Sequence, residues 1–490
     1  MTPRRRFLKY IAGAAGVSAA AAAAYLARGG LPRSNDTTVT SSSSTGSVSA
    51  NIPPDYAEFL TWLGSASKPF RGQQISISLE DEIVPRAIQN RDSDFFNTTQ
   101  INANYSLKPY FLHLADISIM VRTNASSYDV FSIDYQDLGF YKDSIISPTE
   151  LSEMYPDLTY APIRAEDFQT VPWSLLATYP PAGLPSATGQ SSSEVLFVPI
   201  DMPIMVQLYR TDIYNSANVN VAATWDELFD DAQKFTGTSH YTPYGIVNES
   251  SGTIAVVYEY LNHLASFGGS LWDIQGDELV SALGSDQALA ALENYVRFAK
   301  YADPASSTYS WDEVATDMET SIAASALLWY DYAYLLNDPV RSYVPGKIGY
   351  SSNPAGPSGS FSTYGGNGVG VSRKAKNPQV AWLWLQWATS LGLQEMTVLD
   401  AFHVLPTRTA ALNASVVKDA TTGPEYEAFQ AARGIWQSNG VTSLTPFPQW
   451  QNVLAILGPH LSSAYTGGEQ PSNALAASVQ EIEALGKLTL

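Results

Sequence analysis

The order of periodic patterns along the chain most restricts how it can fold. Strand-like and helix-like patterns alternate between residues 73 and 141, beginning with QQISISLED, in which apolar residues recur at every second position. Helical patterns dominate from residue 224, and sheet-like sequence returns between residues 345 and 378. Alternating strands and helices predict an α/β lobe with a mainly parallel sheet. The return to sheet-like sequence predicts a discontinuous body with two lobes.

Two helix starts are signalled by capping boxes. In a capping box, the first hydroxyl bonds the third helical amide, and a carboxylate bonds back to the capping residue. Thr224 and Glu227 have this spacing in TWDELFDDAQKF, and Ser310 and Glu313 repeat it in SWDEVATDM. Helices are therefore expected to begin directly after Thr224 and Ser310.

Composition excludes several classes of partner and chemistry. The 490 residues carry a net charge of -20, and only 15% of them are charged. This balance argues against nucleic acid or an anionic membrane surface as a partner. The chain has no cysteine, which excludes disulfides, and its five histidines are scattered. No metal site and no cofactor are predicted.

The N-terminus has the layout of an export signal. Three arginines at 4–6 precede an apolar, alanine-rich stretch, and the order RRRFLK resembles a twin-arginine motif. Residues 1–30 are predicted to be this signal or an N-terminal anchor, and residues 31–54 a Ser/Thr-rich linker. The protein is therefore expected outside the cell or at its surface, touching membrane only through this segment. Glycosylation sequons fit a secreted chain and occur at Asn35, Asn97, Asn104, Asn124, Asn248 and Asn413.

The chain is also rich in aromatic side chains, with 28 Tyr, 11 Trp and 18 Phe. Three tryptophans in NPQVAWLWLQWATS are expected in the core. Others lie beside Gly, Asp or Pro at segment boundaries, where flat rings can face a cleft and pack against sugar rings. This second set is Trp272, Trp329, Tyr330, Tyr364 and Trp450.

Signals for catalysis are weak. There is no G-x-S-x-G, Walker or dinucleotide-binding motif, and the single S-x-x-K match at Ser65 lacks its companion motifs. A pair of carboxylates for glycoside hydrolysis is assembled by the fold, so local spacing neither shows nor excludes it. The best local candidate is EDE at residues 80–82, but a strand-end cluster in water explains it better. The chain is predicted not to be an enzyme.

The stretch from residue 198 to residue 235 resembles the middle of the family 1 extracellular solute-binding proteins, the maltose-binding-like receptors of ABC importers. These share a proline-containing crossover strand (Pro199), a Tyr-x-x-Asp step (Tyr209 and Asp212) and the helix start TWDEL. Further segments are similar and occur in the family order: YDVFSIDYQDLGFY, LASFGGSLWD, SIAASALLWYDYAY, YGGNGVGVSRKAKNPQVAWLWLQWATS and HVLPTRTAAL. The segment from residue 165 to residue 193 departs from the pattern as a Pro/Ser-rich insertion.

The resemblance implies a type II periplasmic-binding-protein-like α/β fold, whose two discontinuous lobes are joined by crossover strands and close by hinge motion. It assigns residues 55–200 plus 350–400 to lobe one and residues 201–349 plus 401–490 to lobe two. It also implies ligand contacts from both lobes. The expected ligand-binding residues are Glu80, Asp81, Asp134, Tyr135, Asp201, Trp272, Trp329, Asp331, Gly366, Asn367 and Trp450.

Trp329 and Trp450 are expected to stack on a sugar, while Asp134 and Asp331 accept its hydroxyls or cap local turns. The expected partners are a carbohydrate and the membrane subunits of an ABC permease, with the receptor acting as a monomer. Three alternatives stay open: a receptor for a cationic polyamine or peptide on the same fold, an extracellular glycosidase, and a surface-layer or adhesion protein. An acidic cleft would also admit the cationic ligand.

Overall fold

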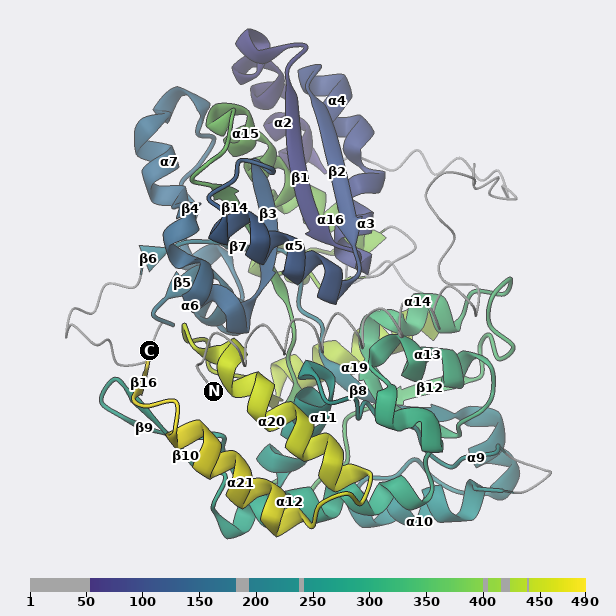
Figure 1. The fold of residues 1–490 in the computed structure, drawn as a ribbon. Helices are drawn as coiled ribbons and strands as arrows, with labels where there is room; N and C mark the ends of the chain where they lie inside the picture. Colours follow the sequence, from purple (N-terminus) through teal and green to yellow (C-terminus); the bar gives the residue numbers. More distant parts are fainter. Residues whose placement is uncertain (1–52, 182–193, 238–241, 400–403, 416–423, 439) are drawn as a thin grey trace. The chain divides into compact units, whose positions relative to one another are not determined.

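Two separate β-sheets organise the chain in the computed structural model (Figure 1). The structure describes residues 53–181, 194–237, 242–399, 404–415, 424–438 and 440–490. The predicted export signal, all of the predicted linker before residue 53 and residues 182–193 of the insertion lie outside these ranges. Pro54–Leu490 forms one unit.

The first sheet has the strand order β2-β1-β3-β14-β4, with β7 also paired to β14. Strands β1, β2 and β3 are mutually parallel, and β14 runs antiparallel to β3, β4 and β7. The mainly parallel first lobe predicted from strand and helix alternation is thus confirmed at its core. The bounds are β1 (Gln74–Glu80), β2 (Asn102–Lys108), β3 (Val130–Asp134), β4 (Ile145–Ile146), β7 (Val198–Pro199) and β14 (Asn367–Ser372).

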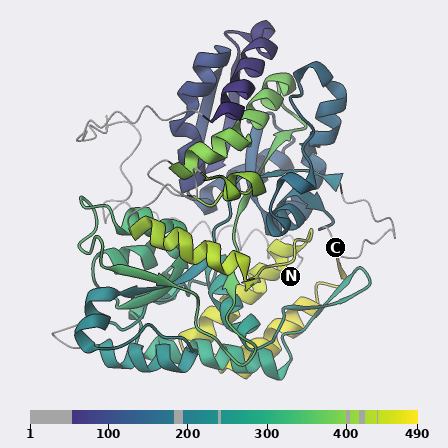
Figure 2. The same cartoon turned by 180° about the vertical axis from the view of Figure 1, so that it is seen from behind.

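Helices cover both faces of the first sheet. Helix α5 lies on one face in Figure 1, and α15 lies on the other, which Figure 2 shows from behind. The three tryptophans of α15 are fully buried, as their apolar surroundings predict. The helices of this lobe are α2 (Pro54–Ala66), α3 (Ile83–Asn90), α4 (Asp92–Thr99), α5 (Tyr110–Arg122), α6 (Leu138–Tyr141), α7 (Pro148–Met154), α8 (Thr170–Pro172), α15 (Pro378–Ala388) and α16 (Leu391–Leu399).

The second sheet places β8 (Met205–Arg210) between β11 (Ser325–Trp329) and β12 (Ile348–Ser351), all antiparallel neighbours. β8 follows β7 after a few residues, so the chain passes from the first sheet to the second at Ile200–Ile204. The expected crossover after Pro199 is therefore present. Smaller sheets join β9 (Trp272–Gln275), β10 (Glu278–Ser281) and β16 (Leu488–Thr489), then β13 (Ser362–Thr363) and β15 (Val441–Thr442), and then β5 (Thr178–Tyr179) and β6 (Glu194–Val195).

Helices form most of the second lobe. Both expected capping boxes are present, at Thr224 before α10 and at Ser310 before α13. The helices are α9 (Thr211–Ala217), α10 (Trp225–Phe235), α11 (Ile254–Ser266), α12 (Asp286–Val296), α13 (Trp311–Glu319), α14 (Ala333–Leu336), α19 (Pro424–Gln437), α20 (Trp450–Tyr465) and α21 (Pro471–Glu483). Helix α17 (Thr409–Asn413) packs against α16 of the first lobe. The residue boundaries given above for the two lobes stay a prediction.

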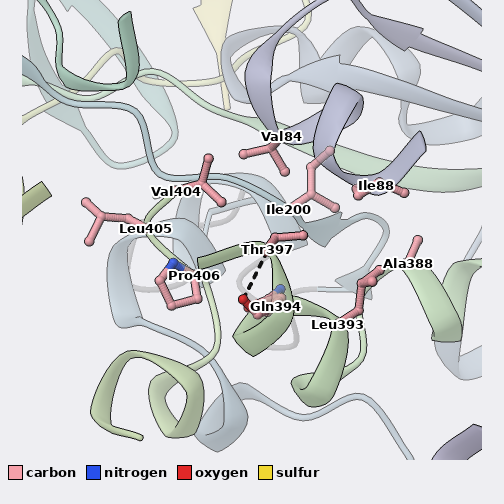
Figure 3. Close-up of a pocket in the computed structure, with 10 residues that line it drawn as sticks. All are labelled: Val84, Ile88, Ile200, Ala388, Leu393, Gln394, Thr397, Val404, Leu405 and Pro406. Atoms are coloured by element: carbon pink, nitrogen blue, oxygen red, sulfur yellow. Dashed lines mark hydrogen bonds between the residues drawn. The ribbon is translucent and has the colours of Figure 1, made fainter. Parts of the chain in front are cut away.

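A small apolar cavity lies between the crossover segment at residues 200–204 and a return segment at residues 404–406. Its volume is about 10 Å³, which is room for one water molecule. Ile200 from the crossover and Leu405 from the return segment line it, together with side chains of α3 and α16 (Figure 3). The backbone amide of Leu405 also donates a hydrogen bond to the Tyr330 hydroxyl, 2.5 Å away. The two segments are therefore packed against each other through side chains from both lobes.

Candidate functional site

Four acidic side chains and one amide are brought together by the ends of strands. Glu80 ends β1, Asp134 ends β3, and Asp201 follows β7, so all three lie at one edge of the first sheet. Asn367 begins the antiparallel β14 and pairs in register with Asp134. Asp331 follows β11 of the second sheet. Carboxyl ends of strands are the usual place for a ligand in an α/β sheet, so this edge is the candidate site.

Asn367 links three of the carboxylates. Its side-chain amide donates to Glu80 Oε2 at 3.3 Å and to Glu82 Oε2 at 3.1 Å. Its backbone amide donates to Asp201 Oδ1. One asparagine thus holds carboxyls from β1, from the loop after it and from the crossover around a single point.

Asp134 belongs to a network that joins the two lobes. Its Oδ2 accepts from Gln136 Nε2 at 2.8 Å and from the Tyr258 hydroxyl at 3.5 Å. Tyr258 is on α11, and its hydroxyl also donates to Gln136 Oε1 at 3.1 Å. Gln136 in turn donates to the Tyr110 hydroxyl at 3.3 Å. A side chain of the second lobe therefore reaches directly into the strand-end cluster of the first.

Burial raises the pKa of every carboxyl in the cluster. It raises the pKa of Asp134 to about 7 and that of Asp331 to about 6. The pKa values of Glu80, Glu82 and Asp201 also lie well above their ordinary range, because burial is reinforced by the neighbouring negative charges. Burial and crowding therefore favour the protonated form of each of these carboxyls over what it would be in water.

Trp329 and Tyr364 provide rings beside the carboxyls. The Trp329 indole edge lies so close to Gly365 that a Cβ there would come within 3.0 Å. Tyr258 meets the same indole edge-to-face, with ring centroids 5.1 Å apart. Gly366 has φ +137°, and an added Cβ would lie 2.6 Å from the Tyr364 hydroxyl. Gly366 therefore allows the chain to pass between this hydroxyl and the carboxyl of Asp201.

Tyr135, which directly follows Asp134, is held in place by contacts with Tyr364 and Leu444. Its hydroxyl donates to the Tyr364 carbonyl at 3.1 Å and accepts from the Leu444 amide at 2.8 Å. Its ring stacks on Tyr364 with centroids 5.3 Å apart. Backbone groups therefore use both hydrogen-bonding directions of the Tyr135 hydroxyl, and a role for Tyr135 in binding stays a prediction.

Three of the expected site residues are not joined to the cluster by any contact that the structure gives. Asp81 pairs with Arg86, with distances of 2.7 and 2.9 Å. Trp272 and Trp450 both pack edge-on against Phe447, at centroid distances of 5.4 and 6.0 Å. Trp450 is 1% exposed and belongs to the core of the second lobe. A role for these three in binding remains a prediction.

Several residues at the site were not among those predicted. Glu82 was recognised only as part of EDE, yet two-residue alternation along an extended chain directs Glu80 and Glu82 to the same side and Asp81 to the other. Gln136 and Tyr258 carried no sequence signal, because a helix and a loop far apart along the chain bring them together. No group of His, Asp and Glu in the described residues is arranged to hold a metal ion.

Comparison with known proteins identifies the class. Residues 113–395 match the bacterial extracellular solute-binding protein family, and the chain belongs to this family. A relative from Sinorhizobium fredii, called a probable amino-acid ABC transporter periplasmic-binding protein, is 22% identical over 66% of this chain and 71% of its own.

Solved structures agree with this fold. A solute-binding protein from Agrobacterium radiobacter K84 in complex with ribitol superposes with a TM-score of 0.72 at 20% identity, covering 85% of this chain and 100% of that one. Maltose-bound MalE3 from T. maritima gives 0.71 at 18% identity, covering 84% and 100%. The two-lobe periplasmic-binding-protein-like fold expected from the sequence is therefore confirmed.

Proposed function

We propose that this protein is the extracellular substrate-binding protein of an ABC importer, which captures a sugar or polyol between its lobes and delivers it to the permease. The observation that carries the proposal is the hydrogen-bond network in which Tyr258 of α11 reaches Gln136 and Asp134 at the ends of the first sheet. Such contacts couple lobe closure to the site, because a ligand that touches both lobes favours the closed state. The family and the ribitol- and maltose-binding neighbours support the ligand class.

The proposal includes delivery from outside the cell. The basic and apolar start of the chain supports export, followed by release or retention at the surface as a monomer. In the part of the chain that the structure describes, no helix is both long and apolar enough to cross a bilayer.

A thermal-shift screen of mono- and oligosaccharides and linear polyols tests the proposal. A specific ligand should raise the unfolding midpoint by mass action, by an amount that grows with ligand concentration. The same ligand should make the small-angle scattering profile more compact. Trp329→Ala should reduce the shift, since the indole borders Gly365 beside the cluster.

A matched control is Trp311→Ala, at a half-buried indole of the second lobe that stacks on Phe111 of α5 with centroids 6.3 Å apart. Loss of this ring should reduce the compaction seen by scattering, while the ligand still raises the unfolding midpoint. Scattering profiles that stay superimposable with every compound that shifts the midpoint would refute capture by closure. Release of reducing sugar from an oligosaccharide would show a glycosidase instead.

A further inference from the structure

The strand-end cluster gathers acidic side chains that have no basic partner among the described residues. Among the described residues, no Lys, Arg or His is ion-paired or hydrogen-bonded to any of the five carboxyls of Glu80, Glu82, Asp134, Asp201 and Asp331. Arg86 is occupied by Asp81 at 2.7 Å, and Arg341 is occupied by Glu319 at 2.7 Å. Burying like charges together costs free energy unless a positive charge accompanies them. The cluster therefore lacks a counter-ion.

Buried polar atoms without partners point to the same place. The Tyr364 side chain is 0% exposed and Asn367 is 1% exposed, yet the Tyr364 hydroxyl and Asn367 Oδ1 have no hydrogen-bond partner among the described residues. A Cβ built on Gly366 would lie 2.6 Å from that hydroxyl and 3.1 Å from Asp201 Oδ1, so both atoms flank one point. Asp331 Oδ1 is also unpartnered. Buried groups of this kind are normally satisfied, so a ligand is needed to complete them.

The missing cation is organic. The described residues contain no set of three or more His, Asp or Glu side chains placed to bind a metal. The surrounding rings of Trp329, Tyr258 and Tyr364 favour an ammonium group, because aromatic faces attract organic cations. Glu82, Asp134 and Asp331 each retain some accessible surface, so a small ligand can reach them.

We propose that the captured ligand is a polyhydroxy compound that bears at least one protonated amine, an amino sugar or amino polyol, and that its ammonium group lies among Glu80, Glu82, Asp134, Asp201 and Asp331. This inference rests on the proposed function and names its substrate class. The amine supplies the counter-charge, and its N–H groups pair with carboxylate oxygens and with Asn367 Oδ1. Hydroxyls of the same ligand meet Tyr364 and Gln136.

Binding should release protons. Without ligand, burial keeps the pKa of Asp134 at about 7 and those of its neighbours above their ordinary values. An ammonium among the carboxyls favours their ionised forms, so protons leave as it binds. Affinity should therefore rise as pH increases from 5 to 7. The other titratable groups near these carboxyls are Asp137, whose pKa burial raises to about 7 and which titrates in the same range, and six buried phenols, which stay neutral throughout: Tyr110, Tyr135, Tyr258, Tyr330, Tyr332 and Tyr364.

Titration calorimetry with matched pairs tests the inference on the folded, exported form of the protein. The pairs are glucosamine with glucose, glucamine with sorbitol, and chitosan disaccharide with its N-acetylated form; spermidine and Ca²⁺ are added alone. In at least one pair, the amine should bind at least ten-fold more tightly than its neutral partner. The heat of binding should depend on the ionisation enthalpy of the buffer, because protons are released. Equal or tighter binding of the neutral member in every pair overturns the inference and leaves the proposed function standing.

The titrations with spermidine alone and with Ca²⁺ alone distinguish the remaining outcomes. Binding of spermidine alone, without any polyhydroxy compound, overturns the proposed function and the amino-polyol class together. Binding of Ca²⁺ at micromolar concentration overturns the organic cation. No binding by any amine-bearing compound also overturns the inference.

Variants locate the amine. Asp134→Asn and Glu82→Gln should each weaken binding of the preferred amine at least ten-fold more than binding of its neutral partner, and should reduce proton release. Asp143→Asn is the matched control, since this exposed carboxyl lies on the same lobe and outside the cluster. Near-ultraviolet circular dichroism of the unliganded variants shows whether each one is folded. Equal loss of affinity for both members of a pair would refute charge recognition.

Discussion

Replacing Asp137 with asparagine should remove a large pH dependence from the stability of the unliganded protein. Asp137 is 1% exposed, Oδ1 accepts from Gln451 Nε2 at 2.6 Å, and Oδ2 has no partner among the described residues. Burial raises its pKa from an ordinary 3.8 to about 7. The folded state therefore favours the neutral carboxylic acid, which an asparagine closely imitates in shape and charge.

The magnitude follows from proton linkage. A rise from 3.8 to about 7 corresponds to about 4 kcal/mol. Because the folded pKa is raised, the folded state binds more protons, so its stability is greatest below the unfolded pKa and decreases as pH rises to about 7. Between pH 5 and pH 8 the wild-type protein should lose about 2.5 kcal/mol through this one group. Asparagine has no proton to lose, so the variant should lose none of that amount.

Urea unfolding of both proteins at pH 5 and pH 8 checks the prediction. With an m-value of about 3 kcal/mol/M, the midpoint difference between variant and wild type should change by about 0.8 M between the two pH values. The variant should be favoured at pH 8. Asp143→Asn, at an exposed carboxyl, should show no such change. A midpoint difference for Asp137→Asn that is the same at both pH values would refute the reasoning.

Three further substitutions test the packing of the second lobe and the site. Trp450→Ala should lower the free energy of unfolding by about 3–5 kcal/mol, because this indole is 1% exposed; an unchanged chemical-denaturation midpoint would contradict its place in the core. Gly366→Ala should destabilise by more than about 2 kcal/mol, since a Cβ meets the Tyr364 hydroxyl at 2.6 Å, whereas Gly72→Ala, at φ +81° with open space, should cost only about 1 kcal/mol. Thr224→Ala removes the hydroxyl that caps α10 and should lower the unfolding free energy by about 1 kcal/mol, measured by the same titration; no loss would mean that the capping bond is replaced.

Sequence reasoning identified the architecture because its signals were local and occurred in order. The alternation in β1, the capping box at Thr224 and the tryptophans of α15 each arise from spacing within one segment. The carboxyls Glu80, Asp134, Asp201 and Asp331 were also accessible to prediction, because each lies at the end of a strand or within two residues after it. These four residues were expected from the family resemblance, and the structure brings them together at the strand ends.

The remaining site residues depended on contacts between distant segments. Tyr258 lies within a helix whose other residues are nearly all buried, so its hydroxyl looked no different from a core tyrosine until α11 met Gln136. Trp450 is the opposite case. It begins α20 two residues after a proline, and its ring was predicted to stack on a sugar. In the structure the indole packs against Phe447 in the core. Whether a boundary aromatic faces ligand or core is decided by tertiary packing, which spacing alone does not encode.

Strand β14 has a consequence for how the molecule can be made. It pairs with β3, β4 and β7, yet it is synthesised only after residues 201–349 of the second lobe, and the Asn367–Glu80 bond joins residues 287 positions apart. A nascent chain that stops before residue 372 therefore lacks a central strand of its first sheet and the residue that gathers the carboxyls. Neither lobe can be expressed as one uninterrupted fragment, and loop closure over such separations makes late, cooperative folding the expected route. Fusion of the segment that ends at residue 200 to residues 367–399 through a short linker, with the intervening residues deleted, would be the way to obtain the first lobe by itself.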